Sequence, residues 1–263
     1  MGAIAKFISR DRAFLGTCAL LFLASAAGTA YLCKSMSGGM EMPGGWTMSM
    51  AWMRIPRQSW LGPAAMFIAM WVVMMVAMML PSLVPTLFNY SRLLRRAERV
   101  NSGALAALAG GTYFLAWAVV GAGAYAVGTL VTTAEMRSVL IASHVPLATA
   151  VVLVLAGCFQ LTGWKKRLLA RCRDEQACSP QVKAGVGGAC RQGIRWGIDC
   201  TLCCAGYMTV LLVTGVMNLG VMAILAIAIA TERITSFPQR TARITGVLLI
   251  VTGAFMIAGV PRA

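Results

Sequence analysis

Sulfur-containing side chains are the residues in this chain whose types and spacing could do chemistry. The 263 residues include 18 Met and nine Cys but a single His. Thioether and thiolate sulfurs are soft ligands that favour Cu(I) over hard ions such as Mg²⁺. One His leaves few of the nitrogen ligands that catalytic zinc sites use. The composition therefore predicts soft-metal binding, with Cu(I) as the ion.

A methionine-rich stretch lies within residues 34–60, between two apolar segments. Residues 36–53 hold six Met, separated mainly by Gly, Ser, Pro and Trp. Closely spaced thioethers on such a loop can converge on one ion, and they do not form disulfides in an oxidising compartment. The alternative is an interfacial loop in which Met serves as adaptable packing. The candidate ligands are Met40, Met42, Met48 and Met50.

The apolar segment at residues 61–80 carries methionines at helical spacing. Met66, Met70, Met74 and Met78 recur every four residues, and Met75 follows Met74 directly. At about 100° per residue, Met74, Met75 and Met78 fall on one face of a helix. This face is either a path for a soft cation or a packing stripe, since Met fills irregular gaps.

Cysteines form a second cluster later in the chain. Six lie within 33 residues, namely Cys172, Cys178, Cys190, Cys200, Cys203 and Cys204. The last three are spaced i, i+3 and i+4, so they share one helix face, and Met208 extends it. Cys172 is a further candidate ligand. The alternative is that these are small buried packing residues.

We expect the helix that carries this cluster to begin near residue 198. The thiols would then lie at a helix N-terminus, where the helix dipole lowers the thiol pKa. Glu232 is a last candidate ligand, because acidic residues near membrane depth are costly and often functional. A pair with a neighbouring basic residue is the equal alternative for Glu232.

The sequence lacks the residues that ATP-driven transport and enzymatic catalysis would need. The chain has no phosphate-binding loop of the P-loop type and no nucleophile–base pair, so we expect neither ATP-driven transport nor an enzyme. The formal charge of +15 would suggest nucleic-acid binding in a soluble protein. Here the basic residues occupy short segments between apolar runs, which membrane topology explains better.

Membrane-spanning helices must position these residues. Hydrophobic residues make up 59% of the chain and charged residues only 12%, against about 25% in soluble proteins. We predict an all-α, polytopic transmembrane helix bundle that forms a single domain over residues 1–263. About seven helices are expected, at residues 14–33, 61–80, 104–131, 145–163, 198–217, 220–231 and 244–260.

Several details of this bundle stay open. The first segment is either a retained helix or a cleaved signal peptide. Pro81 should end or kink the second helix. The fifth and sixth segments are either two helices around the turn at Asn218 or one broken helix.

The basic residues alternate between successive connections. They are concentrated at the N-terminus, after the second segment, in residues 164–197, and after the sixth segment. By the positive-inside rule the N-terminus is cytoplasmic and the C-terminus is outside, which requires an odd number of spans. The methionine-rich stretch is then an outer loop, and residues 164–197 form a basic, Cys-containing cytoplasmic loop. The expected location is the bacterial inner membrane.

The order of these motifs resembles the bacterial predicted metal-binding integral membrane proteins, a family grouped as a domain of unknown function. The resemblance covers about residues 63–260 and rests on residues 71–82, 165–173, 197–204 and the pair Glu232-Arg233. It implies a helical membrane fold and metal binding. Leu168 stands where the family pattern has Cys, so a two-Cys site around Cys172 is incomplete, and Arg233 replaces Lys.

The function expected is Cu(I) binding and transfer or transport across the inner membrane, with a copper chaperone or a cuproenzyme as partner. The alternative is a non-catalytic subunit of a larger membrane complex, such as a respiratory or monooxygenase assembly. Small-residue faces around Gly121, Gly123 and Gly128 would then pack against other subunits. A third alternative is a thiol redox relay through Cys203 and Cys204.

Overall fold

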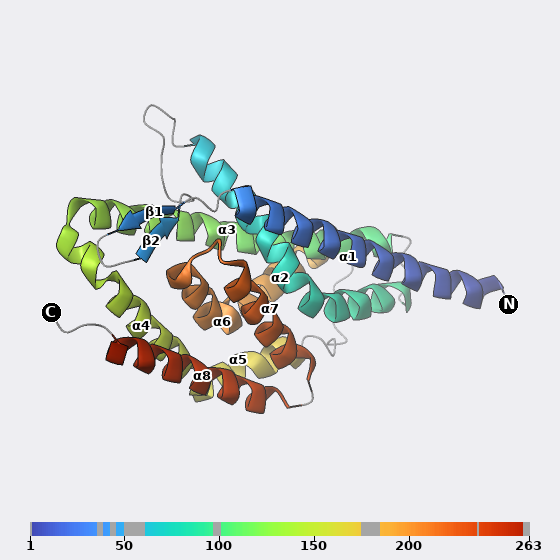
Figure 1. Ribbon diagram of the computed structural model, residues 1–263. Coiled ribbons are helices and arrows are strands. Elements are labelled where there is room, and N and C mark those ends of the chain that lie inside the picture. The colour runs from blue at the N-terminus through green and yellow to red at the C-terminus, as the bar shows by residue number, and fades with distance from the viewer. Residues whose placement is uncertain are drawn as a thin grey trace.

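The long apolar runs of the sequence form helices, because a helix satisfies all of its backbone polar groups within one segment. The computed structural model describes residues 2–35, 39–42, 46–49, 61–96, 101–174, 185–235 and 237–259. In this part of the chain the helices are α1 (Gly2–Ser35), α2 (Leu61–Arg96), α3 (Ser102–Arg137), α4 (Val139–Leu161), α5 (Gly163–Asp174), α6 (Val186–Thr214), α7 (Leu219–Ile234) and α8 (Pro238–Gly259). Figure 1 shows their arrangement.

Six of the described helices are long and apolar enough to cross a membrane: α1 from Arg12, α2, α3, α4, α6 and α8. The 16 residues of α7 span about 24 Å, less than the ~30 Å of a hydrocarbon core. The outward faces carry large apolar side chains, with Leu20 70% and Phe255 79% exposed. Such an apolar surface on long helices is the one a lipid-surrounded bundle requires. The all-α, membrane-type fold is therefore confirmed.

A short hairpin follows α1 in the stretch that was expected to be a loop. Strands β1 (Gly39–Met42) and β2 (Trp46–Ser49) pair antiparallel, with Met40 opposite Met48. Met50 lies outside the described residues, as do the side chains of Met40, Met42 and Met48. Their role as ligands therefore stays a prediction.

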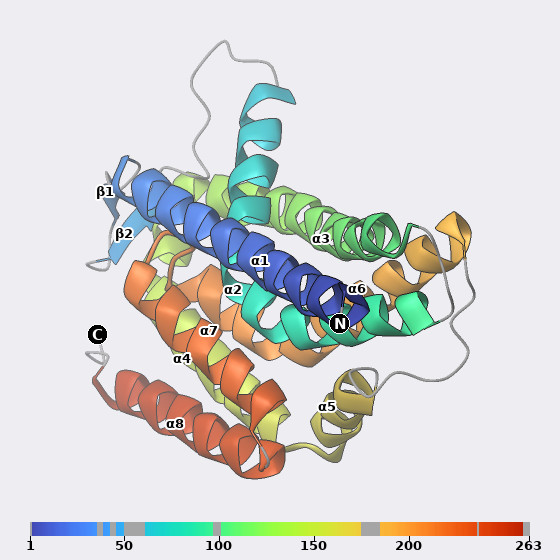
Figure 2. The same ribbon diagram turned by 90° about the vertical axis from the view of Figure 1, so that its right-hand side faces the viewer.

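The centre of the bundle is formed by α2, α3 and α6. Helix α6 packs against α3, α4, α5 and α7, while α2 packs against α1, α3 and α7. Helices α4 and α8 form a pair on the side of the bundle away from α1, as Figure 2 shows. The N-terminal end of α1 and the C-terminal end of α8 lie at opposite ends of the bundle in Figure 1. Six crossings would bring the chain back to the side on which it began, so termini at opposite ends require α7 as a short seventh crossing. That crossing and the side that faces the cytosol stay predictions.

Two helix boundaries differ from those expected. Helix α2 continues through Pro81 and Pro85 to Arg96. The ribbon of α2 bends along its length in Figures 1 and 2, as a proline in a helix interior causes, so the kink expected at Pro81 is confirmed and an end of the helix there is not. Helix α6 begins at Val186 rather than near residue 198, so much of the expected loop at 164–197 is helical in α5 and α6.

The split between the fifth and sixth segments is confirmed. Helices α6 and α7 are separate, and Asn218 caps α7 by accepting a hydrogen bond from the Val221 amide at 3.1 Å. An Asn in this position satisfies one of the free amides at a helix N-terminus. The minimal turn around Asn218 is therefore a true helix boundary.

Two glycines allow α6 to lie directly against α3. A Cβ at Gly193 would overlap the carbonyl oxygen of Ala109, and one at Gly197 would lie 2.6 Å from the Ala116 Cβ. Small residues at helix crossings let membrane helices approach closely. By contrast, Gly187 in the first turn of the same helix has open space around it.

This difference gives a matched pair of substitutions. We expect Gly193→Ala to destabilise the fold by about 1–3 kcal/mol, because the added methyl group meets backbone that cannot move aside. Gly187→Ala should be neutral or stabilising by up to about 1 kcal/mol, since it only restricts the unfolded chain. Thermal unfolding of both variants in detergent measures the difference. Equal unfolding temperatures would contradict the close α3–α6 contact.

Candidate functional site

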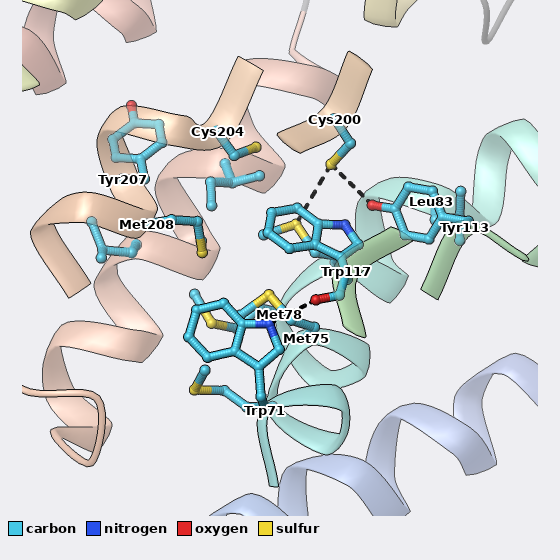
Figure 3. Close-up of a cluster of buried hydrophobic side chains, with 14 of the residues drawn as sticks. Trp71, Met75, Met78, Leu83, Tyr113, Trp117, Cys200, Cys204, Tyr207 and Met208 are labelled. Carbon is cyan, nitrogen blue, oxygen red and sulfur yellow. Dashed lines mark hydrogen bonds between the residues drawn. The ribbon is translucent and has the colours of Figure 1, made fainter. Parts of the chain in front are cut away.

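The methionine face of α2 is buried inside the bundle. Met74, Met75, Met78 and Met79 are all buried, whereas Met66, nearer the start of the helix, is 63% exposed. The helix is held in this rotation by Trp71, whose Nε1 donates a hydrogen bond to the Trp117 carbonyl at 3.0 Å (Figure 3). The thioethers of α2 therefore face other helices rather than lipid.

The three clustered cysteines of α6 are buried as well. Cys200, Cys203 and Cys204 lie on the part of α6 that packs inside the bundle. Since α6 begins at Val186, these thiols lie well inside the helix and not at its N-terminus. The expected effect of the helix dipole is therefore wrong, because that effect falls off within the first turn.

The thioethers and the thiols meet at Cys200. Its Sγ lies 3.9 Å from Met79 Sδ and accepts a hydrogen bond from the Tyr113 hydroxyl at 3.0 Å. Figure 3 shows Met75, Met78, Cys204 and Met208 around the same interior region. Helices α2, α3 and α6 thus bring together a soft-ligand cluster that is sealed from solvent.

The cysteines form a connected series rather than one convergent site. Cys204 neighbours both Cys200 and Cys203, and Cys203 neighbours Cys172 on α5. Within the described part of the chain, no three His, Cys, Asp or Glu side chains lie close enough to share one metal ion. The contacts between sulfur atoms in this part of the chain are therefore pairwise, as between Met79 and Cys200.

Cys172 is tied into the structure by two further contacts. Its Sγ donates a hydrogen bond to the Asp199 carbonyl at 3.3 Å and accepts one from the Arg233 guanidinium at 3.5 Å. The hydrogen bond to Cys203 and burial raise the pKa of the Cys172 thiol well above its usual range. Both effects disfavour the thiolate form of Cys172.

Arg233 is a buried cation that faces thiols. It is only 6% exposed and lies within electrostatic reach of Cys172, Cys200 and Cys204. Among the residues that the structure describes, its Nε has no hydrogen-bond partner. A buried charge is costly unless it is paired, so the thiols are the groups able to compensate it once they lose their protons.

The Glu232 carboxylate contacts a lysine and two hydroxyl groups rather than the cysteines. Its Oε2 accepts a hydrogen bond from Lys165 Nζ at 2.9 Å, while its Oε1 accepts hydrogen bonds from the hydroxyls of Tyr207 and Thr245. Lys165 also donates to the Cys203 carbonyl at 2.8 Å. This buried network joins α5, α6, α7 and α8. A metal-ligating role for Glu232 would require the loss of these contacts.

Lys165 keeps its charge in this network. Burial alone would lower the pKa of its ammonium group, but the nearby Cys203 and the Glu232 carboxylate outweigh that effect and raise the pKa. The Lys165–Glu232 pair is therefore internally neutral. Because Glu232 already compensates Lys165, the deprotonated thiols are the groups that can compensate the charge of Arg233.

Comparison with known proteins now identifies the family. Residues 68–256 match the PpoB2 family, which is described as a copper chaperone. The chain belongs to this PpoB2 copper-chaperone family. The match covers the methionine face of α2 and all the cysteines of the α6 cluster, while α1 and the hairpin precede it. Comparisons with curated proteins and with solved structures give no match.

Sequence reasoning missed several residues that shape this PpoB2 site. Met79 shares the four-residue spacing of Met75 and could have been included on that basis. Tyr113 and Lys165 gave no local signal, because one lies within an apolar run and the other among basic residues. Arg233 was noted only as the neighbour of Glu232. Their proximity to the thiols arises from helix packing alone.

The buried pair between Lys165 and Glu232 gives a stability prediction. Glu232→Gln should lower the free energy of unfolding by about 3–5 kcal/mol, because it leaves the Lys165 charge buried and unpaired. The double variant Lys165→Met/Glu232→Gln should cost less than the sum of the two single changes. Thermal unfolding in detergent tests this, with Lys166→Met as the control at the half-buried neighbouring lysine. Additive losses would show that the two side chains do not interact.

Proposed function

We propose that this PpoB2 protein binds Cu(I) at the contact between Met79 and Cys200 and passes it along the neighbouring thiols. The observation that carries the proposal is the 3.9 Å separation of Met79 Sδ and Cys200 Sγ in the buried interior. It joins the thioether face of α2 to the thiol face of α6. Copper is the cargo of this protein, which acts as a carrier and not as an enzyme.

The order of the ligands favours movement in one direction. Thioethers bind Cu(I) weakly and exchangeably, while thiolates bind it more tightly. With the expected topology in the bacterial inner membrane, the methionine hairpin is outside and the basic segment around Cys172 is inside. The proposed transfer is therefore inward, toward a cytosolic copper chaperone or a cuproenzyme under assembly.

The charge of Arg233 supports a monovalent cargo. In the proposed site the second thiolate is that of Cys204, the neighbour of Cys200. Two thiolates and one Cu(I) carry a net charge of −1, which the guanidinium cancels. A divalent ion on the same two thiolates would leave the buried site with a net positive charge. Because uncompensated buried charge is strongly unfavourable, the site as built favours Cu(I) over Zn(II).

The alternative of a structural subunit has less support from packing. A Cβ at Gly121 would lie 2.5 Å from Trp71 Cδ1, so this glycine serves the contact between α2 and α3 within the chain. Gly123, two residues further along α3, has open space beside it. The small-residue face thus has an internal role in positioning the methionine helix.

Copper loading of site variants tests the proposal. We expect Cys200→Ser/Cys204→Ser to lose Cu(I) affinity by at least the ~10–100-fold that removal of an outer partner costs a metal site. Met79→Leu should weaken binding while the core remains filled. The measurement is competition with a Cu(I) chelator, under reducing conditions, on the full chain in detergent.

Matched control variants exist for both changes. Cys158→Ser removes an exposed thiol on α4, and Met66→Leu removes an exposed thioether on α2. Both should bind Cu(I) as the wild type does. Wild-type affinity in the double-Cys variant would overturn the proposed site.

The role of Arg233 gives a separate test. Arg233→Gln should reduce Cu(I) affinity by about 10–100-fold and shift the preference toward Zn(II), whereas Arg233→Lys keeps the charge and should retain much of the preference. The ratio of Cu(I) to Zn(II) dissociation constants is the readout, because loss of packing alone would not change it selectively. An unchanged ratio in Arg233→Gln would refute charge selection.

A further inference from the structure

A second pair of soft ligands lies near the C-terminal end of α6, away from Cys200. Cys33, in the last turn of α1, is 5% exposed, and its Sγ lies 3.9 Å from the Sδ of Met217. Met217 is half-buried in the turn between α6 and α7. Neither residue was expected to be a ligand, and Cys33 precedes the part of the chain that matches the PpoB2 family.

We propose that Cys33 and Met217 form a second Cu(I) site, at which the ion is received before it moves to the Met79–Cys200 site. This inference rests on the proposed function, because it names the residues that would bind Cu(I) before the ion reaches Met79 and Cys200. The ligand class is a soft monovalent cation, Cu(I) or Ag(I).

The pair has the chemistry and the access that such a site needs. A thiol on α1 and a thioether in the α6–α7 turn provide two soft donors from segments far apart in the sequence. The half-buried Met217 can meet an incoming ion, while the buried Cys33 holds it away from solvent. Two backbone features shape the turn: Gly215 adopts φ 109°, and the Asn218 amide donates to the Gly215 carbonyl at 3.1 Å.

Charge also favours a monovalent ion here. When Cu(I) binds, the Cys33 thiol releases its proton to water and a Cu–S bond forms, so one thiolate and one Cu(I) give a neutral site. A divalent ion would leave a positive charge in a low-dielectric region. The outer pair therefore needs no equivalent of Arg233, which serves a site with more than one thiolate.

Buried thioethers belong to the same core as the two sites. From Cys200 to Thr214, near Met217, α6 rises roughly 20 Å at about 1.5 Å per residue. Seven buried methionines belong to the same core cluster as Cys33 and Cys200, namely Met70, Met74, Met75, Met78, Met79, Met208 and Met222. They come from α2, α6 and α7. An ion that left the outer pair would thus pass soft side chains along the interior.

The methionine hairpin adjoins the outer pair through the chain itself. Strand β1 begins at Gly39, shortly after Cys33, and β2 returns with Met48 opposite Met40. In Figure 1 the hairpin lies beyond the C-terminal end of α1, toward the end of the molecule opposite the N-terminus. The outer pair is therefore placed between the methionine-rich segment and the core.

Metal stoichiometry and affinity of the full chain in detergent test this inference, with Cu(I) and then Ag(I) as probes. We expect Cys33→Ser and Met217→Leu each to bind one ion fewer than the wild type, or to weaken one site by about 10-fold or more. Met217→Leu keeps an apolar side chain of similar size, so it remains informative if Cys33→Ser does not fold. The controls are Cys18→Ser, at a buried thiol on the same helix, and Met136→Leu, at an exposed thioether.

The outcomes separate this inference from the proposed function. Loss of one ion in the Cys33 and Met217 variants, with the other ion lost only in Cys200→Ser/Cys204→Ser, supports two sites. Wild-type stoichiometry and affinity in the Cys33 and Met217 variants, with all binding lost in the double-Cys variant, would overturn the outer site and leave the proposed function intact. No Cu(I) binding by the wild type would overturn both.

Discussion

The close contact between α3 and α6 is the constraint on which the candidate site depends. Gly193 and Gly197 remove the side chains that would otherwise hold the two helices apart. Because α6 lies directly on α3, the Tyr113 hydroxyl reaches Cys200, and the thiol face of α6 turns toward the thioethers of α2. A wider separation would leave the same residues buried but without their sulfur contacts.

Burial of charge organises the other side of the site. Lys165 and Glu232 neutralise each other within a network that links four helices. The adjacent Arg233 points instead to the cysteines. In a low-dielectric interior a cation without a carboxylate partner stabilises negative charge on nearby thiols. The protein thus places a fixed positive charge where copper–thiolate binding would create a negative one.

The sequence was informative where a signal is local. Apolar runs of sufficient length predicted the helices, and the cap at Asn218 marked the boundary between α6 and α7. The spacing of the methionines placed Met74, Met75 and Met78 on one face of α2, and the structure buries that face. A local signal failed at the start of α6, because packing against neighbouring helices extended that helix beyond the point where its own sequence suggested a beginning. At Pro81 the helix does not end but bends, which is one of the two outcomes expected there (Figure 2).

The sequence by itself determined that this is a helical, membrane-type chain rich in soft ligands, because hydrophobicity and side-chain chemistry are properties of the residues themselves. Only the tertiary structure decided that Met79 meets Cys200, that Arg233 faces the thiols, and that Cys33 meets Met217. Each of these contacts joins segments far apart in the sequence. Their distances depend on how closely the helices approach and how each is rotated, and no periodicity within a single helix specifies either quantity.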